Sequence, residues 1–350
     1  MPHTRTAVSV PLTLIRYHAY QIDVLPVMRV TLTVLVDSNP TAERFAALSA
    51  LEPANPFCTP QYAAYRRGRG DQELVLLELE SSRIVSGCAA FLRVGKLHVT
   101  LDIPSRPSLR DHDRFWLGVQ DFCRRAGVTL ISVNSFASAP GPMPGLWRVT
   151  RSKQRREYVI SLAEPPTTRA MRKGHAYEVK RGAKAGLSLR RTSDPAACEA
   201  HVRLMNASIT RQLRLGKNVT AVEQITPFRQ LLESGAGEMF QATLDGEVQA
   251  SSMILRARAA GYNHTQGTSP RGMSCGAAHF LIYEIAKCLR HDGMQAFNIG
   301  GTDEFGGGLE RFKTGFSANT RCVSLESAEF RAAGTLGTML RACARILAQR

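Results

Sequence analysis

The same order of predicted elements occurs twice along this 350-residue chain, and this repeat restricts its fold more than any other feature. The first copy reads DQELVLLELESSRIVSGCAAFLRVGKLHVTL (residues 71–101), then RFWLGVQDFCRRAGVTLISVN (114–134). The second reads AGEMFQATLDGEVQASSMILRARAAGYNHTQ (236–266), then HFLIYEIAKCLRHDGMQAFNIGG (279–301). Each copy predicts three strands joined by short turns, then a helix and a further strand. The repeat indicates two domains of one kind, a tandem duplication.

Apolar residues at helical spacing predict the helix in each copy. Phe115, Val119 and Phe122 recur at three- and four-residue intervals in the first copy. The corresponding residues of the second copy are Phe280, Ile282, Ile285, Ala286 and Leu289. Bases in the last turn and a glycine beyond it, Gly127 or Gly293, are typical helix endings. A helix-rich stretch precedes each copy.

These patterns predict an α/β (α+β) fold of two tandem domains, each a mostly antiparallel mixed sheet flanked by helices. The expected boundaries are an N-terminal extension at 1–27, a first domain at 28–165, a second at 166–330 and a C-terminal helix at 331–350.

Charge is the strongest signal in the composition. The formal net charge is +16, and between Arg148 and Arg191 thirteen bases face three acids. Such a basic concentration favours partners that carry phosphate. The eight cysteines are scattered without a Cys-x-x-Cys pair, which indicates reduced thiols in a cytoplasmic protein and argues against structural zinc. We assign no metal. No apolar run reaches the ~20 residues of a membrane span.

The segment GTDEFGGGLERFKTGF, Gly301 to Phe316, combines three consecutive glycines with a base between aromatic residues. Consecutive glycines are costly unless the backbone turns sharply or approaches a ligand closely. We therefore expect a loop that passes close to a ligand and then presents Lys313 to it.

Four segments carry a resemblance to a known family. They are NPFCTPQYAAY (55–65), DIPSRPSLRD (102–111), MRKGHAYEVKRGAKAGLSLRR (171–191) and FNIGGTDEFGGGLERFKTGF (297–316). Together with the repeat, they resemble the Fem-type (FemABX-like) aminoacyl and peptidyl transferases, whose domains have the GNAT acyltransferase fold. The chain departs from the family pattern at Asn298, where the family has Asp. It also lacks the glycine of a Pro-Arg-Gly-Pro turn, so that Arg106 and Asp111 align only approximately.

The resemblance implies a catalytic role for Lys313, in contact with the acyl carbonyl or with the terminal nucleotide of the donor. A fixed ammonium between Phe312 and Phe316 would stabilise an oxyanion. Asp303, Glu304 and Asp111 are candidate general bases, although the amine can also lose its proton to water. Transfer from an ester to an amine requires no covalent nucleophile.

The other predicted residues would hold the donor and the acceptor. Arg169, Arg172, Lys173, Lys180 and Lys184 would form one helical stripe for the tRNA phosphates, interrupted at Gly174. The full set of predicted substrate- and tRNA-binding residues is Arg106, Arg169, Arg172, Lys173, Lys180, Arg181, Lys184, Tyr262, Asn298, Arg311, Phe312 and Phe316.

By resemblance, the predicted protein is a cytoplasmic aminoacyltransferase that forms an amide between an aminoacyl group from charged tRNA and an acceptor amine. The acceptor would be a peptidoglycan precursor or an intermediate of antibiotic biosynthesis, and no cofactor is expected. The alternative is an acyl-CoA-dependent GNAT N-acyltransferase. Arg271 to Gly276 is a degenerate form of the loop that binds CoA pyrophosphate, with Ser274 in place of its first glycine.

Overall fold

The computed structural model describes residues 32–214, 216, 224–302 and 306–332. The predicted N-terminal extension, Asp303 and Glu304, and residues 333–350 of the predicted C-terminal helix lie outside these residues. Strand β12 occupies the chain up to Arg331, where that helix was expected to begin.

The predicted repeat is confirmed. The first half contains β1 (Leu32–Asp37), α1 (Ala42–Leu51), η1 (Pro56–Cys58), α2 (Pro60–Gly68), β2 (Gln72–Glu80), β3 (Arg83–Val94), β4 (Val99–Ile103), α3 (His112–Ala126) and β5 (Leu130–Val133). The second half contains η2 (Thr168–Ala170), α4 (Lys173–Lys184), β7 (Ser188–Thr192), α5 (Ala197–Arg214), α6 (Ile225–Glu233), β8 (Gly237–Leu244), β9 (Glu247–Arg256), β10 (Ala260–Thr268), α7 (Pro270–Ser274), α8 (Ala277–His291), β11 (Ala296–Thr302) and α9 (Gly308–Thr314). The order β2-β3-β4-α3-β5 thus recurs as β8-β9-β10-α8-β11.

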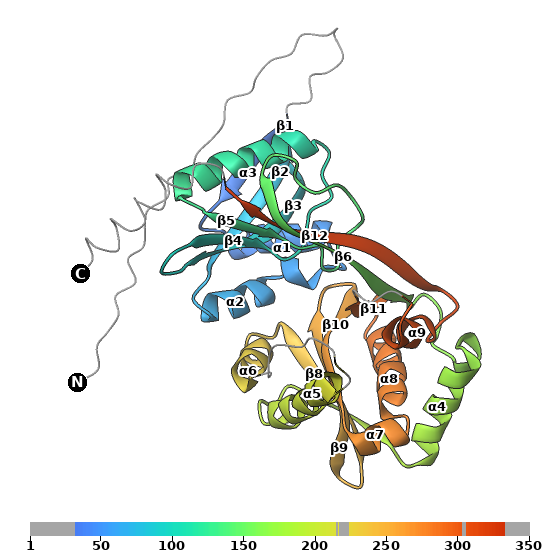
Figure 1. Cartoon of the computed structure of the whole chain (residues 1–350). Helices are drawn as coiled ribbons and strands as arrows, with labels where there is room; N and C mark the ends of the chain where they lie inside the picture. Colours follow the sequence, from blue (N-terminus) through green and yellow to red (C-terminus); the bar gives the residue numbers. More distant parts are fainter. Residues whose placement is uncertain (1–31, 215, 217–223, 303–305, 333–350) are drawn as a thin grey trace, which may run out of the picture.

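Two long strands join the halves into one sheet. They are β6 (Arg148–Ser161) and β12 (Thr320–Arg331), which pair antiparallel with each other. The described strands run in the order β1-β2-β3-β4-β5-β12-β6-β11-β10-β9-β8-β7. β12 therefore returns from the second half to pair with β5 of the first, and Figure 1 shows it crossing between them. Only β4/β5 and β10/β11 pair in parallel within the described sheet.

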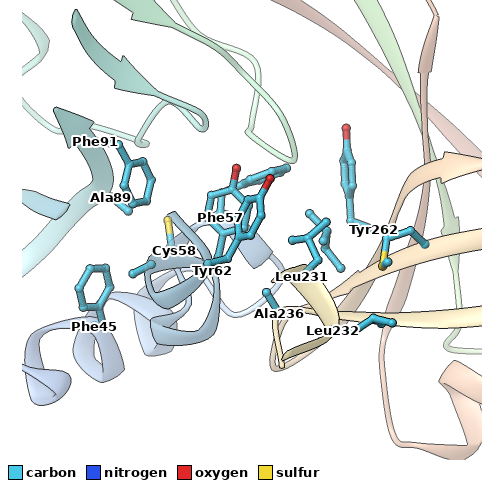
Figure 2. Packing of buried hydrophobic residues seen from close by; sticks show 14 of the residues in the cluster. Phe45, Phe57, Cys58, Tyr62, Ala89, Phe91, Leu231, Leu232, Ala236 and Tyr262 are labelled. Atoms are coloured by element: carbon cyan, nitrogen blue, oxygen red, sulfur yellow. The ribbon is translucent and has the colours of Figure 1, made fainter. Parts of the chain in front are cut away.

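Within the described part of the chain, one hydrophobic core combines side chains from both halves. Phe57 and Tyr62, from the first half, share a buried cluster with Leu231 and Tyr262 from the second (Figure 2). The Phe57 ring lies edge-on to Tyr62 at 5.1 Å and to Tyr262 at 5.3 Å between centroids. Each fully buried side chain of this size contributes about 1.5–3 kcal/mol. This shared core holds the second-half strand β10 against the first half.

Candidate active site

The parallel strands β10 and β11 separate partway along their length. They pair only from Ala260–Tyr262 to Ala296–Asn298, although both strands continue further. Just beyond, β10 has a bulge between Asn263 and Thr265 in its register with β9. A bulge bends its strand and redirects side chains, and the separation leaves a cavity of about 450 Å³, which we call the Lys313 cavity.

The Lys313 cavity is bounded by the two separating strands, the C-terminal part of α5, the start of α8, and α9. Its lining comprises Ser208, Arg211, Gln212, Tyr262, Asn263, His264, Thr265, Gln266, Thr268, Gly272, Met273, Gly276, Ala278, His279, Ile299, Gly301, Leu309, Phe312 and Lys313. Of the residues predicted for the site, the structure brings Lys313, Phe312 and Tyr262 to this cavity.

Lys313 lies at the point where the strands part. Its side chain is buried, and its ammonium donates a hydrogen bond to the carbonyl oxygen of Ile299 on β11. Gly300 has φ +76°, and a Cβ there would lie 2.9 Å from the Asn263 carbonyl oxygen and 3.5 Å from Lys313 Nζ. Burial lowers the pKa of Lys313 to about 8. The cavity is therefore lined by a buried ammonium that loses its proton as the pH rises through about 8.

The aromatic residues around Lys313 anchor its helix. Phe312 and Phe316 pack edge to face with ring centroids 5.0 Å apart, and His279 lies 4.9 Å from Phe312. His175, on α4, packs 4.9 Å from Phe316, and its Nε2–H donates to the Phe312 carbonyl oxygen at 2.7 Å. These four rings fix α9, and with it the direction of Lys313.

A substitution at Gly315 tests the packing of His175 against the end of α9. A Cβ at this position would lie 2.2 to 2.5 Å from three ring atoms of His175. We expect Gly315→Ala to destabilise the protein by about 1–3 kcal/mol, the usual cost of overpacking. Urea unfolding of Gly315→Ala, His175→Ala and the double variant checks the cause. The double variant should lose less stability than the sum of the losses in the two single variants, because the alanine at position 315 no longer meets the ring. Losses that simply add would contradict the proposed contact.

Tyr262 and Asn298 meet at a buried carboxylate that the sequence analysis did not select. Glu157, on β6, is 1% exposed. It accepts hydrogen bonds from Tyr262 Oη (2.8 Å), Asn298 Nδ2 (2.8 Å) and the backbone N–H of Ala137 (3.0 Å). Asn298 Oδ1 in turn accepts from the N–H of Gly300, at 2.9 Å. Glu157 thus links both halves to the turn beneath Lys313. The only feature of the sequence that could have drawn attention to it is its position as an acid inside a basic run.

A basic groove of about 340 Å³ adjoins the Lys313 cavity, and we call it the β6 groove. It is lined by Ser132, Asn134, Phe136, Arg151, Lys153, Arg155, Thr302, Ser327, Ala328 and Glu329. The guanidinium of Arg155 lies 4.4 Å from the Phe136 ring centroid and 3.3 Å from Glu157. Gly301 lines the Lys313 cavity and the next residue, Thr302, lines the groove. The end of β11 therefore separates two neighbouring sites.

The predicted basic stripe is corrected in part. Helix α4 begins at Lys173, so Arg169 lies in the preceding 3-10 turn and Arg172 is only the N-cap residue, whereas Gly174 lies within the helix. Arg181 is ion-paired with Glu178. One exposed face of α4 carries three cations at spacings of seven and four residues, namely Lys173, Lys180 and Lys184.

Three other predicted residues are not among those that line the cavity. Asp111 is the N-cap of α3, where it accepts a hydrogen bond from the Arg114 N–H. Arg106 is buried and donates to the carbonyl oxygens of Ala139 and Pro142, at 2.6 and 2.7 Å. Both contacts organise the first half. Arg311 is exposed on α9.

The degenerate CoA-type loop is folded as α7, followed by Gly276 at the N-cap of α8. A Cβ at Gly276 would lie 2.5 Å from the backbone oxygen of Glu178 and 2.9 Å from its carboxylate. Helix α4 thus places the Glu178–Arg181 ion pair beside the N-terminus of α8.

No group of three or more His, Cys, Asp or Glu side chains suited to a metal ion occurs among the described residues. None of the helices in the described part of the chain is both long and apolar enough to cross a bilayer.

Comparisons with known proteins identify the class of fold. Residues 169–314 match the family model of the acetyltransferase (GNAT) domain. Over the greater part of the chain the fold is the tandem GNAT fold that was predicted. It is similar to a crystal structure of FemX at 12% identity, with a TM-score of 0.59, covering 81% of this chain and 95% of that one.

Two further solved structures have a similar fold. One is the tandem GNAT protein from the clavulanic acid biosynthesis pathway, at 12% identity and a TM-score of 0.51, covering 86% of this chain and 99% of that one. The other is L-PGS from Bacillus licheniformis, at 13% identity and a TM-score of 0.51, covering 90% and 99%. At these identities the similarity concerns the fold alone. No curated protein matches this chain in sequence.

Proposed function

We propose that this chain is a cytoplasmic aminoacyltransferase that transfers an aminoacyl group from charged tRNA to the amine of a peptidoglycan precursor or an antibiotic intermediate. The observation that carries the proposal is the buried ammonium of Lys313 at the point where β10 and β11 separate. A neutral amine attacks the ester carbonyl, and the fixed cation stabilises the negative charge that develops on its oxygen. The leaving group is the ribose hydroxyl of the tRNA.

Two surfaces support the assignment of the substrates. The exposed lysines of α4 suit the phosphates of an acceptor stem, which are bound through charge and not through base reading. The β6 groove, with Arg151, Lys153 and Arg155, suits an anionic acceptor whose amine reaches past Gly301 toward Lys313. The loop from Arg271 to Gly276 departs from the CoA-binding pattern at Ser274, which weakens the CoA alternative.

A transfer assay tests the proposal directly. Radiolabelled aminoacyl groups on a total charged-tRNA pool are offered with a panel of amines: lysine, glucosamine and a peptidoglycan-precursor peptide. We expect amide formation that is lost when RNase destroys the charged tRNA. Acetyl-CoA should not support the reaction in place of charged tRNA. Labelling that resists RNase and requires acetyl-CoA would contradict the tRNA donor and support the CoA-dependent reaction.

The double variant Lys180→Glu/Lys184→Glu should weaken donor binding without changing the chemical step. Because each lost phosphate contact lowers the salt slope of the binding constant by about one, two contacts give a change of about two. Filter binding of charged tRNA at several salt concentrations measures this slope. The matched control is Arg83→Glu/Lys96→Glu, two exposed cations of the first half. Equal losses in both double variants would show that net charge alone is responsible.

A further inference from the structure

The N-terminal part of strand β6 has one edge that pairs with no described strand. On one side, β6 pairs with β12 from Arg148 to Ile160. On the other side, it pairs with β11 only from Arg156 to Ser161. Every residue from Arg148 to Gln154 is exposed. This stretch, which we call the β6 edge, therefore has a free side that continues the line of β11 and lies beside the β6 groove.

The backbone groups on the free side follow from the strand pairing. Just after β6, Leu162 donates its N–H to the carbonyl oxygen of Gln295, on the side of β11. Backbone N–H and C=O groups point to opposite sides of a strand at successive residues, and the register of β6 with β12 is regular as far as Arg151. Ser152 and Gln154 therefore direct their N–H and C=O groups to the free side. An added strand could pair with all of these groups.

Side chains of alternate residues give the neighbouring groove a positive charge. Arg151, Lys153 and Arg155 line the β6 groove together, because every second side chain of a strand lies on the same face. Glu329 is the one acid among the described residues that line this groove. A second copy of this chain would bring the same cations to the edge, and like charges on paired strands repel. Charge therefore favours an acidic strand over a second copy.

The neighbours of β6 indicate the direction of an added strand. Both β11 and β12 run antiparallel to β6, and antiparallel pairing is slightly more stable than parallel pairing. An antiparallel strand would begin opposite Gln154, with its amino terminus nearest to the end of β11. Because Gly301 pairs with Glu157, the position opposite Gln154 lies three residues further along that line, about 10 Å away. About three leading residues would therefore bring a terminal amine to Gly301, which lines the Lys313 cavity.

We propose that the β6 edge binds an extended acidic peptide as an additional antiparallel strand, with its terminal amine directed toward Lys313. Main-chain hydrogen bonds to Ser152 and Gln154 hold the peptide backbone, and the groove cations Arg151 and Lys153 select acidic side chains at every second position. The direction of the amine rests on the proposed function, in which this peptide is the acceptor. The binding surface itself does not depend on that function.

Fluorescence anisotropy of a labelled peptide measures this binding. The probe has a free amino terminus, about three small leading residues, then alternating Glu and Val, and a dye at its carboxyl end. Ser152→Pro removes one outward N–H, and proline is tolerated where an edge N–H faces solvent, so we expect binding to weaken about five- to tenfold. The matched control, Ser152→Ala, loses the hydroxyl that donates to Glu326 but keeps the N–H, and it should bind like the wild type. Thermal unfolding shows whether both variants keep the fold.

Modified peptides test the same contact on the wild-type protein. N-methylation of the peptide amides that point at β6 should abolish binding, whereas N-methylation of the alternate amides should leave it unchanged. A probe with Lys in place of Glu should not bind. Arg151→Glu should weaken binding of the acidic probe, because it removes one of the groove cations.

Three results would overturn strand addition. They are equal binding by Ser152→Pro and Ser152→Ala, equal sensitivity to both sets of N-methyl groups, and no binding of the probe at all. In the last case the cations only keep the edge from pairing. A dimer of this chain that Ser152→Pro abolishes would show that the edge holds a second copy instead.

A transfer assay with the same probe separates this inference from the proposed function. If the probe binds but receives no label from charged tRNA, the proposed function fails and the binding surface stands. If small amines receive the label and the probe does not bind, the proposed function stands and the inference fails.

Discussion

Lys313→Met should lower kcat by about 10²- to 10³-fold, the usual effect of removing one oxyanion-stabilising donor. Methionine fills a similar volume without charge, so α9 should keep its contacts with Phe316 and His175. Steady-state kinetics with charged tRNA measure the loss, and thermal unfolding shows whether the fold is kept. Lys287→Met, which changes a more exposed lysine paired with Glu284 on α8, is the matched control. Full activity in Lys313→Met would refute the assigned role.

The same residue predicts a pH dependence. Because burial lowers the pKa of Lys313 to about 8, the ammonium is charged below that pH and loses its proton above it. Activity that needs the charge should therefore fall as pH rises through about 8. Lys313→Arg remains charged at every accessible pH, so whatever activity it retains should lack this fall. If the activity of Lys313→Arg falls with rising pH in the same way as that of the wild type, another group is responsible for the fall.

Glu157→Ala should cause the largest loss of stability, about 3–5 kcal/mol, the usual cost of breaking a buried ionic contact. Alanine leaves the Tyr262 hydroxyl, the Asn298 amide and the Ala137 N–H without their acceptor, and Arg155 without its carboxylate. Since these donors come from both halves, the loss weakens their connection.

Urea unfolding of the wild type and of Glu157→Ala measures this loss. The matched control is Glu284→Ala, which removes only a partly exposed pair with Lys287 and should cost less than about 1 kcal/mol. Stability of Glu157→Ala within 1 kcal/mol of the wild type would show that the network contributes little. Glu157→Gln keeps the shape of the side chain but replaces one acceptor oxygen by a donor. Its stability should lie between that of the wild type and that of Glu157→Ala.

The parts of the fold that were predictable depend on neighbours along the chain. Val119 and Ile285 lie on buried helix faces because apolar residues recur there at helical spacing. Gly127 ends α3 with φ +70°, as its position after Arg124 and Arg125 indicated. Asp111 was considered for catalysis, yet its place just before a helix is equally typical of an N-cap, which is what the structure shows.

The contacts that build the site join residues far apart in sequence. Glu157 meets Tyr262 and Asn298 across 105 and 141 residues. No local spacing marks such contacts. Lys313 was selected because its segment resembles a family motif, but its partner, the Ile299 carbonyl, is visible only in the folded chain.

The amino-acid sequence by itself determined the tandem repeat, the succession of strands and helices, and the basic character of the middle of the chain, because these depend on local periodicity and composition. The tertiary structure decided where β10 and β11 separate, which carboxylate joins the halves, and which part of β6 keeps a free edge. These features arise from strand pairing and close packing between distant segments, and no stretch of sequence carries them alone.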